Sequence, residues 1–196
     1  MISSQRLMES VFKYRGLLWG AFALAILVFQ VYPSVGRTIL AVPLLVGGQT
    51  LRFWAAGVIP KYRTLILDAP ELVTRGPYAW VRNPLYAGNG VMGCGWALMA
   101  GWQWVAAFAV VYLAIYSFAI IPYEERFLLQ RFKEEYLDYR NSTPAMIPSL
   151  SGFAVRLKEG GGGFDLKKSW SMERHSLKMN MLVTLLVVTR LLASRA

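Results

Sequence analysis

The stretch that decides the fold runs from Asn83 to Tyr123, NPLYAGNGVMGCGWALMAGWQWVAAFAVVYLAIYSFAIIPY, and none of its 41 residues is charged. A membrane helix needs about 20 apolar residues to cross a hydrocarbon core of about 30 Å. At a rise of about 1.5 Å per residue, a single helix of this length would measure roughly 60 Å. The run therefore predicts a hairpin of two membrane helices, with its break at Ala100-Gly101-Trp102.

Further charge-free runs predict more membrane helices on either side of this hairpin. The 21 residues between Arg15 and Arg37 are uncharged, which is about one crossing. No small-residue cleavage site follows this first run, so we expect it to be retained as a membrane helix. Four membrane helices are expected, at Gly16–Tyr32, Val35–Ile59, Leu85–Met99 and Trp102–Ile121. A fifth segment, Leu177–Ala193, is interrupted by charges and either spans by snorkelling or lies in the interface.

The composition agrees with a membrane protein and excludes several other classes. Hydrophobic residues make up 56% of the chain and charged residues only 16%, against about 25% charged in soluble domains. A mean hydropathy of +0.40 excludes an intrinsically disordered chain. Because Cys94 is the single cysteine and His175 the single histidine, we expect neither a disulfide scaffold nor a zinc cluster, and no metal site.

The distribution of charge predicts how the protein lies in the membrane. In the expected topology, 17 of the 21 basic residues and all 11 acidic residues fall on the side that holds the N-terminus. Basic loops face the cytoplasm, so we expect an integral membrane protein whose N-terminus and active site are cytoplasmic. The net charge of +10 then reflects topology and contact with anionic membrane lipid. No nucleic-acid partner is expected, because no basic recognition module is present.

The segment that leads into the hairpin, Leu72–Gly88, contains turn, capping and charged residues in close succession at the expected cytoplasmic boundary. Gly76-Pro77 is a turn signal, and Pro84 suits the first turn of a helix. Asn83 is then a good N-cap, and Arg82 lies beside a helix end whose free N–H groups attract an anion. A helix cap with an interfacial arginine and tyrosine explains the same residues without a ligand.

The segment after the hairpin, Tyr123–Arg140, predicts an amphipathic helix along the cytoplasmic interface. Its apolar stripe consists of Leu129, Phe132 and Tyr136 at helical spacing, with Leu128 and Tyr139 beside it. The Glu124-Glu125 pair is expected to end a membrane helix, where carboxylates oppose the helix dipole. Such an unfavourable placement suggests a function, with ribose hydroxyls or a cationic group as partners. The expected fold class is all-α, a polytopic membrane protein with four to five transmembrane helices and this amphipathic helix.

Three further features complete the organisation of the chain. Arg52 is the only charge well inside an expected membrane helix, which favours either a functional role or snorkelling to the cytoplasmic side. Gly93, Ala97 and Gly101 form a small-residue face for helix packing. Gly160–Gly163 indicates a flexible linker. We expect a membrane core over residues 1–150, a cytoplasmic linker over 151–176 and a C-terminal membrane or interfacial helix over 177–196.

These two segments resemble the integral-membrane methyltransferases that include isoprenylcysteine carboxyl methyltransferase and phosphatidylethanolamine N-methyltransferase. The family pattern is a Gly-Pro-Tyr, an Arg-His/Asn-Pro-x-Tyr-x-Gly, an uncharged hairpin, a Glu-Glu-x-x-Leu and a Tyr-x-x-Tyr before a proline stop. Its parts here are Gly76-Pro77-Tyr78, Arg82 to Gly88, Glu124 to Leu128, Tyr136 to Tyr139 and Pro144 to Pro148. The resemblance covers about 75 residues in the family's order.

The resemblance implies a methyltransferase that uses S-adenosylmethionine as its cofactor at the cytoplasmic membrane face. The implied cofactor-binding residues are Gly76, Tyr78, Arg82, Asn83, Pro84, Tyr86, Glu124 and Glu125, and the nominated catalytic residues are Arg52 and Glu125. The methionine carboxylate suits the helix N-terminus after Asn83, and the ribose hydroxyls or the ammonium suit a glutamate. Methyl transfer needs positioning and exclusion of water more than an acid or base, which explains why no catalytic triad is visible.

The methyl acceptor stays open at this point. The expected acceptor is lipophilic or amphiphilic, either an isoprenylcysteine-type carboxylate, a phospholipid amine or a small thiol. The carboxyl-methylating branch usually has histidine where this chain has Asn83, a departure that brings it nearer to the phospholipid branch. Two other classes remain as alternatives, namely a membrane sterol-type reductase that binds a nicotinamide cofactor and a non-enzymatic membrane subunit.

Overall fold

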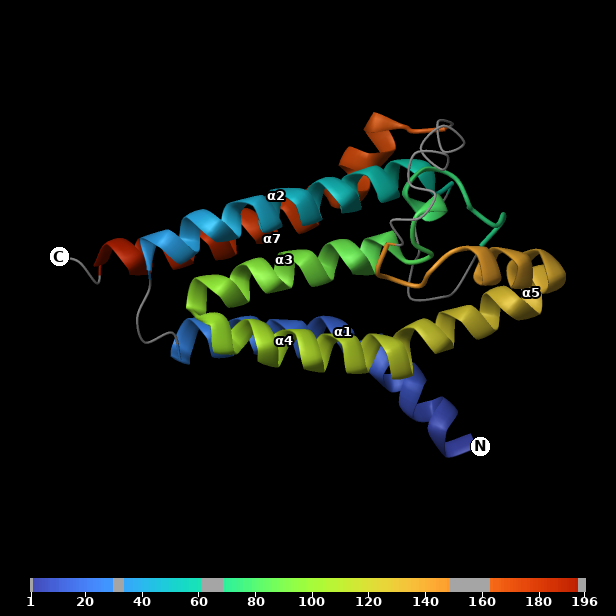
Figure 1. Cartoon of the computed structure of the whole chain (residues 1–196), viewed down its shortest axis with the longest axis horizontal. Coiled ribbons are helices and arrows are strands. Elements are labelled where there is room, and N and C mark those ends of the chain that lie inside the picture. The colour runs from blue at the N-terminus through green and yellow to red at the C-terminus, as the bar shows by residue number, and fades with distance from the viewer. Residues whose placement is uncertain (1, 30–33, 61–68, 149–162, 194–196) are drawn as a thin grey trace.

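The computed structural model describes residues 2–29, 34–60, 69–148 and 163–193, and the secondary structure in these ranges is entirely helical. The long helices lie side by side along one axis (Figure 1). In that view α3 runs between α2 with α7 on one side and α4 with α1 on the other. The elements are α1 (Ile2–Phe29), α2 (Val35–Val58), the 3-10 turn η1 (Gly76–Ala79), α3 (Pro84–Ala100), α4 (Trp102–Ile115), the π-helical turn η2 (Tyr116–Ile120), α5 (Ile121–Ser142) and α7 (Leu166–Ala193).

The expected hairpin is confirmed, with its break at Gly101 between α3 and α4. Gly101 has a φ of 153°, a conformation that L side chains rarely adopt, and it ends α3 and begins α4. The small-residue face is confirmed at Gly93, where an added Cβ would lie 2.0 Å from Cζ of Phe108. Glycine at this position therefore lets the two arms of the hairpin approach closely.

A second close approach, which the sequence did not suggest, joins α2 to α3. A Cβ on Gly48 would lie 2.6 Å from the carbonyl oxygen of Gly88, and a Cβ on Gly88 would lie 2.7 Å from that of Gly48. The added Cβ on Gly88 would also lie 2.7 Å from Cγ of Arg52. The two glycines bring the helix backbones into contact and place the Arg52 side chain against the start of α3.

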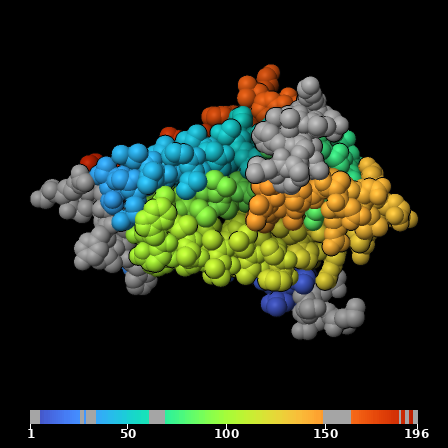
Figure 2. Space-filling view, viewed as in Figure 1, coloured from blue at the N-terminus to red at the C-terminus, as the bar shows by residue number. Residues whose placement is uncertain are grey.

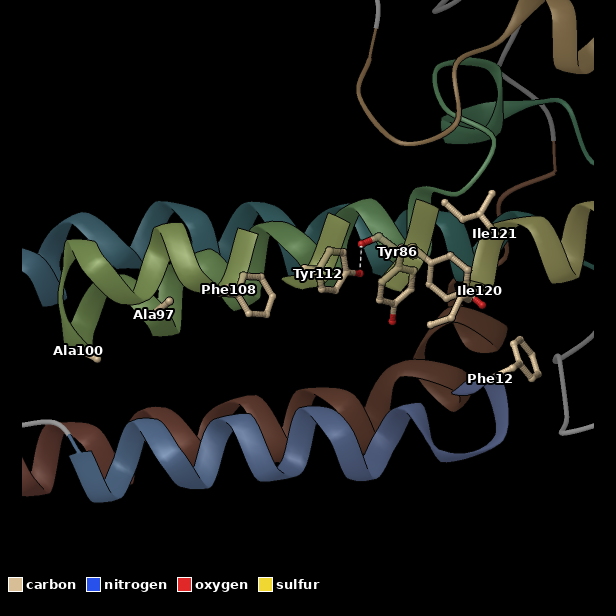
Figure 3. Packing of buried hydrophobic residues seen from close by; sticks show 9 residues of the cluster. Phe12, Tyr86, Ala97, Ala100, Phe108, Tyr112, Ile120 and Ile121 are labelled. Atoms are coloured by element: carbon tan, nitrogen blue, oxygen red, sulfur yellow. Dashed lines mark hydrogen bonds between the residues drawn. The ribbon is translucent and has the colours of Figure 1, made fainter. Parts of the chain in front are cut away.

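An aromatic core joins α1 to the hairpin and to η2. The rings of Tyr112 and Tyr116 stack with centroids 4.1 Å apart, and the ring of Tyr86 lies 4.7 Å from that of Tyr116. The Tyr112 hydroxyl donates to the Tyr86 carbonyl oxygen over 2.7 Å, as Figure 3 shows. Trp19 of α1 donates its indole N–H to the Tyr116 hydroxyl over 3.3 Å. These contacts hold α1 against the hairpin.

The expected position of the glutamate pair at the end of a helix is wrong. The chain stays helical from Trp102 through η2 and α5 to Ser142, so Glu124 lies in the first turn of α5. The wider π-helical turn η2 lies directly before α5. Pro122 therefore occupies the first turn of α5, where proline is tolerated because its missing N–H is not needed for a helix hydrogen bond. The carboxylates therefore do not oppose the dipole of a helix end.

Helix lengths also differ from the expected ones. Helix α1 begins at Ile2 rather than at Gly16, and α7 begins at Leu166 rather than at Leu177. The expected end of the first helix at Tyr32 and the linker residues 151–162 lie outside the described residues. Helix α5 bends at Lys133, which has φ 48° and ψ −118°. The amphipathic helix is present, but this bend interrupts its stripe, so that Tyr136 and Tyr139 are buried beyond it.

Two described stretches are long and apolar enough to cross a membrane, Val35–Val58 and Trp102–Ser142. Large apolar side chains also lie exposed on the outer faces of the bundle. Examples are Leu17 and Leu24 on α1 and Ile39 and Val46 on α2, which are at least 60% exposed. Figure 2 shows one broad face of the molecule, on which α2 lies above α3 and α4. An apolar outer surface of this kind suits a lipid environment.

Replacing Gly48 by alanine should destabilise the protein, whereas the same change at Gly47 should stabilise it. The Gly48→Ala methyl group has to push α2 away from α3, while nothing lies within 4 Å of the corresponding position on Gly47. We expect Gly48→Ala to lower the free energy of unfolding by about 1–3 kcal/mol. Gly47→Ala should raise it by up to about 1 kcal/mol. Thermal unfolding in detergent measures both, and equal shifts would contradict the helix contact.

Candidate functional site

A polar cavity of about 190 Å³ opens where α2 ends and where α3 and α5 begin. We call it the polar cavity. This is the end of the bundle where the loops gather in Figure 1. Seven residues expected in the site line it, namely Arg52, Tyr78, Arg82, Asn83, Pro84, Tyr86 and Glu124. Gly76 and Glu125 are not among its lining residues. Arg15, Asn89 and Glu173 also line it, and the sequence did not place them there.

The start of α3 is held by the segment that follows α5. The backbone N–H of Arg82 donates to the Pro144 carbonyl oxygen over 2.8 Å, and that of Asn83 donates to the Ala145 carbonyl oxygen over 3.0 Å. The Asn83 amide also donates to the Ala145 oxygen, over 3.2 Å. The prediction that its side chain caps the helix is therefore wrong, because the side chain is used to tie the two segments together.

Arg82, which lines the polar cavity, forms a largely buried ion pair with Glu125. Nη2 and Nε of Arg82 donate to Oε1 of Glu125 over 2.7 and 3.0 Å. Nη1 of Arg82 donates to the carbonyl oxygens of Arg140, over 3.0 Å, and of Thr143. The guanidinium therefore links the loop before α3 to both ends of α5. Burial, and then the negative charge of Glu125, raise the pKa of Tyr136 above its ordinary value.

Glu124 is the buried carboxylate of the polar cavity, with 2% of its surface exposed. Its Oε1 accepts a hydrogen bond of 2.6 Å from the Tyr86 hydroxyl, which crosses from α3 to α5. Arg15 of α1 lines the same cavity, and its guanidinium lies 3.9 Å from the centre of the Phe12 ring. A carboxylate and a guanidinium therefore share one partly enclosed space, which suits a ligand that carries charges of both signs.

Arg52 pairs with Glu173 of α7. Nη2 and Nε of Arg52 donate to the two carboxylate oxygens of Glu173 over 2.7 and 2.9 Å. Nη1 of Arg52 donates to Oδ1 of Asn89 on α3 over 2.6 Å, and Gln49 donates to Oε2 of Glu173 over 3.1 Å. The side chains of Arg52 and Glu173 are 15% and 3% exposed. This cluster joins α2, α3 and α7 beside the polar cavity.

One feature of the sequence could have indicated Glu173 as a site residue. An arginine inside an apolar helix requires a carboxylate partner, and Glu173 is the acidic residue nearest to the C-terminal apolar segment. It was missed because the helix was expected to begin only at Leu177. His175, two residues further on, is exposed. Within residues 2–29, 34–60, 69–148 and 163–193, no group of three or more His, Cys, Asp or Glu residues is arranged to hold a metal ion.

Comparison with known proteins gives one family and several partial relatives. The sequence profile of the phospholipid methyltransferase family matches residues 36–135, from the start of α2 into α5. The cobalt-zinc-cadmium resistance protein CzcN of Cupriavidus metallidurans is 40% identical over 82 residues, 41% of this chain and 37% of that protein. The nickel-cobalt-cadmium resistance protein NccN of Alcaligenes xylosoxydans xylosoxydans is 40% identical over 104 residues, 52% of this chain and 45% of that protein.

A named methyltransferase is also similar. The protein-S-isoprenylcysteine O-methyltransferase of Mus musculus is 37% identical over 93 residues, 46% of this chain and 32% of that protein. The chain thus spans less than half the length of each of these three relatives. No solved structure matches the chain. The family match includes Arg52, the loop before α3 and the glutamate pair, and it excludes α7.

Glu173→Ala should strongly destabilise the protein, because it leaves the Arg52 guanidinium buried without its carboxylate. Removing one partner of a buried ion pair costs about 3–5 kcal/mol. The double variant Arg52→Met/Glu173→Leu should recover most of this loss, because it removes both charges and fills the space with apolar atoms. Thermal unfolding in detergent compares the variants. A single variant as stable as the unmodified protein would show that the pair does not hold α7.

Proposed function

Because this chain belongs to the phospholipid methyltransferase family, we propose that it transfers a methyl group from S-adenosylmethionine to an amphiphilic acceptor. The observation that supports this most is the polar cavity itself. It gathers the residues of both family segments, which lie on either side of the uncharged hairpin, around the buried carboxylate of Glu124. The same residues would form only a helix cap if the two segments lay apart.

The donors and acceptors of the polar cavity fit the proposed cofactor. S-adenosylmethionine supplies a methyl group on a sulfonium centre and carries an ammonium, a carboxylate and ribose hydroxyls. Glu124 can accept hydrogen bonds from an ammonium or from hydroxyls, while Tyr86 holds one of its oxygens in place. Arg15 and the start of α3 present positive charge to a carboxylate.

The other charged residues of the site act by positioning in this proposal. Arg82 and Glu125 fix the loop before α3 against α5, so they shape the polar cavity without needing to contact the ligand. Glu125 was nominated as catalytic, and its contacts to Arg82 and Arg140 favour the positioning role. Arg52 is held beside the polar cavity by Glu173, where it can orient an anionic or polar acceptor head group. Such a site needs to align two reactants and exclude water.

The proposed acceptor is an isoprenylcysteine-type carboxylate or a similar amphiphile. The similarity to a protein-S-isoprenylcysteine O-methyltransferase supports the carboxylate, and Arg52 is a suitable partner for it. The family match supports a phospholipid amine as the second candidate. A sterol-type reductase would bind a nicotinamide cofactor instead, and a non-enzymatic subunit would bind neither cofactor.

We propose four membrane crossings by α1, α2, α3 and α4 with η2, with α7 as a fifth and α5 in the cytoplasmic interface. The polar cavity then lies at the cytoplasmic face, and residues 1–150 form the methyltransferase core. At about 1.5 Å per residue, the 28 residues of α7 reach roughly 42 Å, enough to cross with tilt. The charged half of α7 carries Glu173 and lies at the same end as the polar cavity.

Cofactor binding is the first test. S-adenosylmethionine or S-adenosylhomocysteine should stabilise the detergent-purified protein by about 2.7 kcal/mol at a ligand concentration of 100 Kd. Glu124→Gln keeps the shape of the side chain but removes its charge, so it should abolish most of this thermal shift. Glu134→Gln, an exposed position on the same helix, is the control and should keep it. Stabilisation by NADPH alone would support the reductase, and no stabilisation by any of these ligands would refute the proposal.

Orientation is tested with two cysteine variants made in a Cys94→Ser background. Gln103→Cys lies exposed at the turn between α3 and α4, and Glu135→Cys lies exposed on α5. In intact cells a membrane-impermeant maleimide should label the first and leave the second unlabelled until the cells are opened. The reverse pattern would place the polar cavity on the outer side.

A further inference from the structure

A second cavity lies inside the bundle, next to the polar cavity and deeper along α3. It measures about 190 Å³ and its lining is mostly apolar. We call it the inner apolar cavity. Its walls come from α1, α3, α4 and α7, and include Trp19, Gly93, Phe108 and Val183. In Figure 3 the ribbons of α1 and α7 lie on the same side of the α3–α4 hairpin, which carries Phe108 and Tyr112.

We propose that this inner apolar cavity receives the hydrocarbon part of the methyl acceptor and that the side chains of α7 select it. The inference deepens the proposed function and rests on it. An amphiphile of this kind has its reactive head group in the polar cavity and its chain along α3. The chemical class of the ligand is therefore a single-chain amphiphile whose polar group lies directly at the end of its apolar chain.

Continuity between the two cavities is the first argument. Asn89 lines both of them, and its Oδ1 accepts the hydrogen bond from Arg52. From Asn89 to Trp96, which also lines the inner apolar cavity, α3 advances by seven residues, or about 10 Å. If the head group of the acceptor lies beside Asn89 and Arg52, its hydrocarbon chain can contact about two helical turns of the apolar wall.

The second argument is that one face of α7 borders both cavities. Met172 and Glu173 line the polar cavity, and Ser176, Met179, Asn180 and Val183 continue at helical spacing along the inner apolar cavity. Met179 is 45% exposed, so the inner apolar cavity opens towards the surrounding lipid at this margin. An amphiphile can therefore reach it from the membrane without crossing water.

The size of the space is the third argument. Protein interiors are close-packed, and they contain few voids larger than a water molecule. An apolar cavity of this size stays dry and binds apolar ligands. Helix α7, which supplies one wall of this cavity, lies outside residues 36–135, the segment that matches the family.

An outer groove between α2 and α7 is the competing location. It is larger, about 830 Å³, and is lined by apolar residues such as Val42, Leu182 and Leu185. It is open, however, and Leu182 and Leu185 are 48% and 62% exposed, as expected of a surface covered by annular lipid. Glu173 lines both this groove and the polar cavity, but its two oxygens are already bonded to Arg52 and Gln49, so the groove meets the polar cavity at an ion pair.

Photolabelling of the full chain in lipid nanodiscs distinguishes the two locations. The probe is an N-acetylcysteine thioether with a diazirine in its farnesyl-length chain. Adducts are expected on residues of the inner apolar cavity, with Met179 and Val183 as the positions on α7. Adducts confined to Leu182 and Leu185, or no adduct above a lipid-only background, would overturn the proposal.

A matched pair of variants on α7 gives the second readout. Val183→Trp fills the inner apolar cavity and should lower labelling about tenfold, because apolar contact area is lost. Leu185 lines the outer groove, so Leu185→Trp should give labelling of the inner apolar cavity within a factor of about two of the unmodified protein. If both variants label like the unmodified protein, the proposal is wrong. Ala23→Leu, which fills the same cavity from α1, replaces Val183→Trp if that variant does not fold.

The thermal shift with S-adenosylhomocysteine separates this inference from the proposed function. Val183→Trp should keep that shift, because Val183 does not line the polar cavity. Labelling of the inner apolar cavity without any shift in the unmodified protein would refute the methyltransferase proposal while leaving the amphiphile site. A normal shift with labelling only in the outer groove would refute the site alone.

Discussion

The two-bond ion pair between Arg52 and Glu173 is the interaction on which the arrangement of the bundle depends. A guanidinium among apolar helices is tolerable only if a carboxylate and further acceptors satisfy it, and here Glu173 and Asn89 do so. Satisfying Arg52 fixes α7 against α2 and brings one polar face of α7 to the polar cavity. The cavity wall and the docking of the last helix are thus consequences of one buried charge.

Glycine contacts and a second ion pair complete this frame. The approach of Gly48 to Gly88 sets the distance between α2 and α3, so that Arg52, one turn after Gly48, can reach Asn89, the residue after Gly88. On the other side of the site, Arg82 and Glu125 hold the loop before α3 against α5. Residues far apart in the chain, including those of this loop, therefore surround Glu124.

Helices that follow from the local pattern of charges could be predicted from the sequence. Contacts between residues that are distant in the chain could not. Charge spacing was enough for the hairpin and its break at Gly101, because membrane thickness limits helix length. The family segments also nominated Tyr86 and Glu124 for one site, and in the structure the Tyr86 hydroxyl donates to Glu124. The partner of Arg52 was not predictable by periodicity, since Glu173 lies 121 residues away. The Glu124-Glu125 pair was expected to end a helix, whereas a π-helical turn lets the helix continue through Pro122 and past the pair.

The separation between Arg52 and its partner also orders events during synthesis. Translation at about 5–20 residues per second puts roughly 6–24 s between Arg52 and Glu173. During that interval the Arg52 guanidinium lacks the carboxylate that satisfies it in the finished protein. A chain that ends before α7 therefore keeps this charge without its partner, so the last helix to be made is the one that completes the charge balance of the bundle.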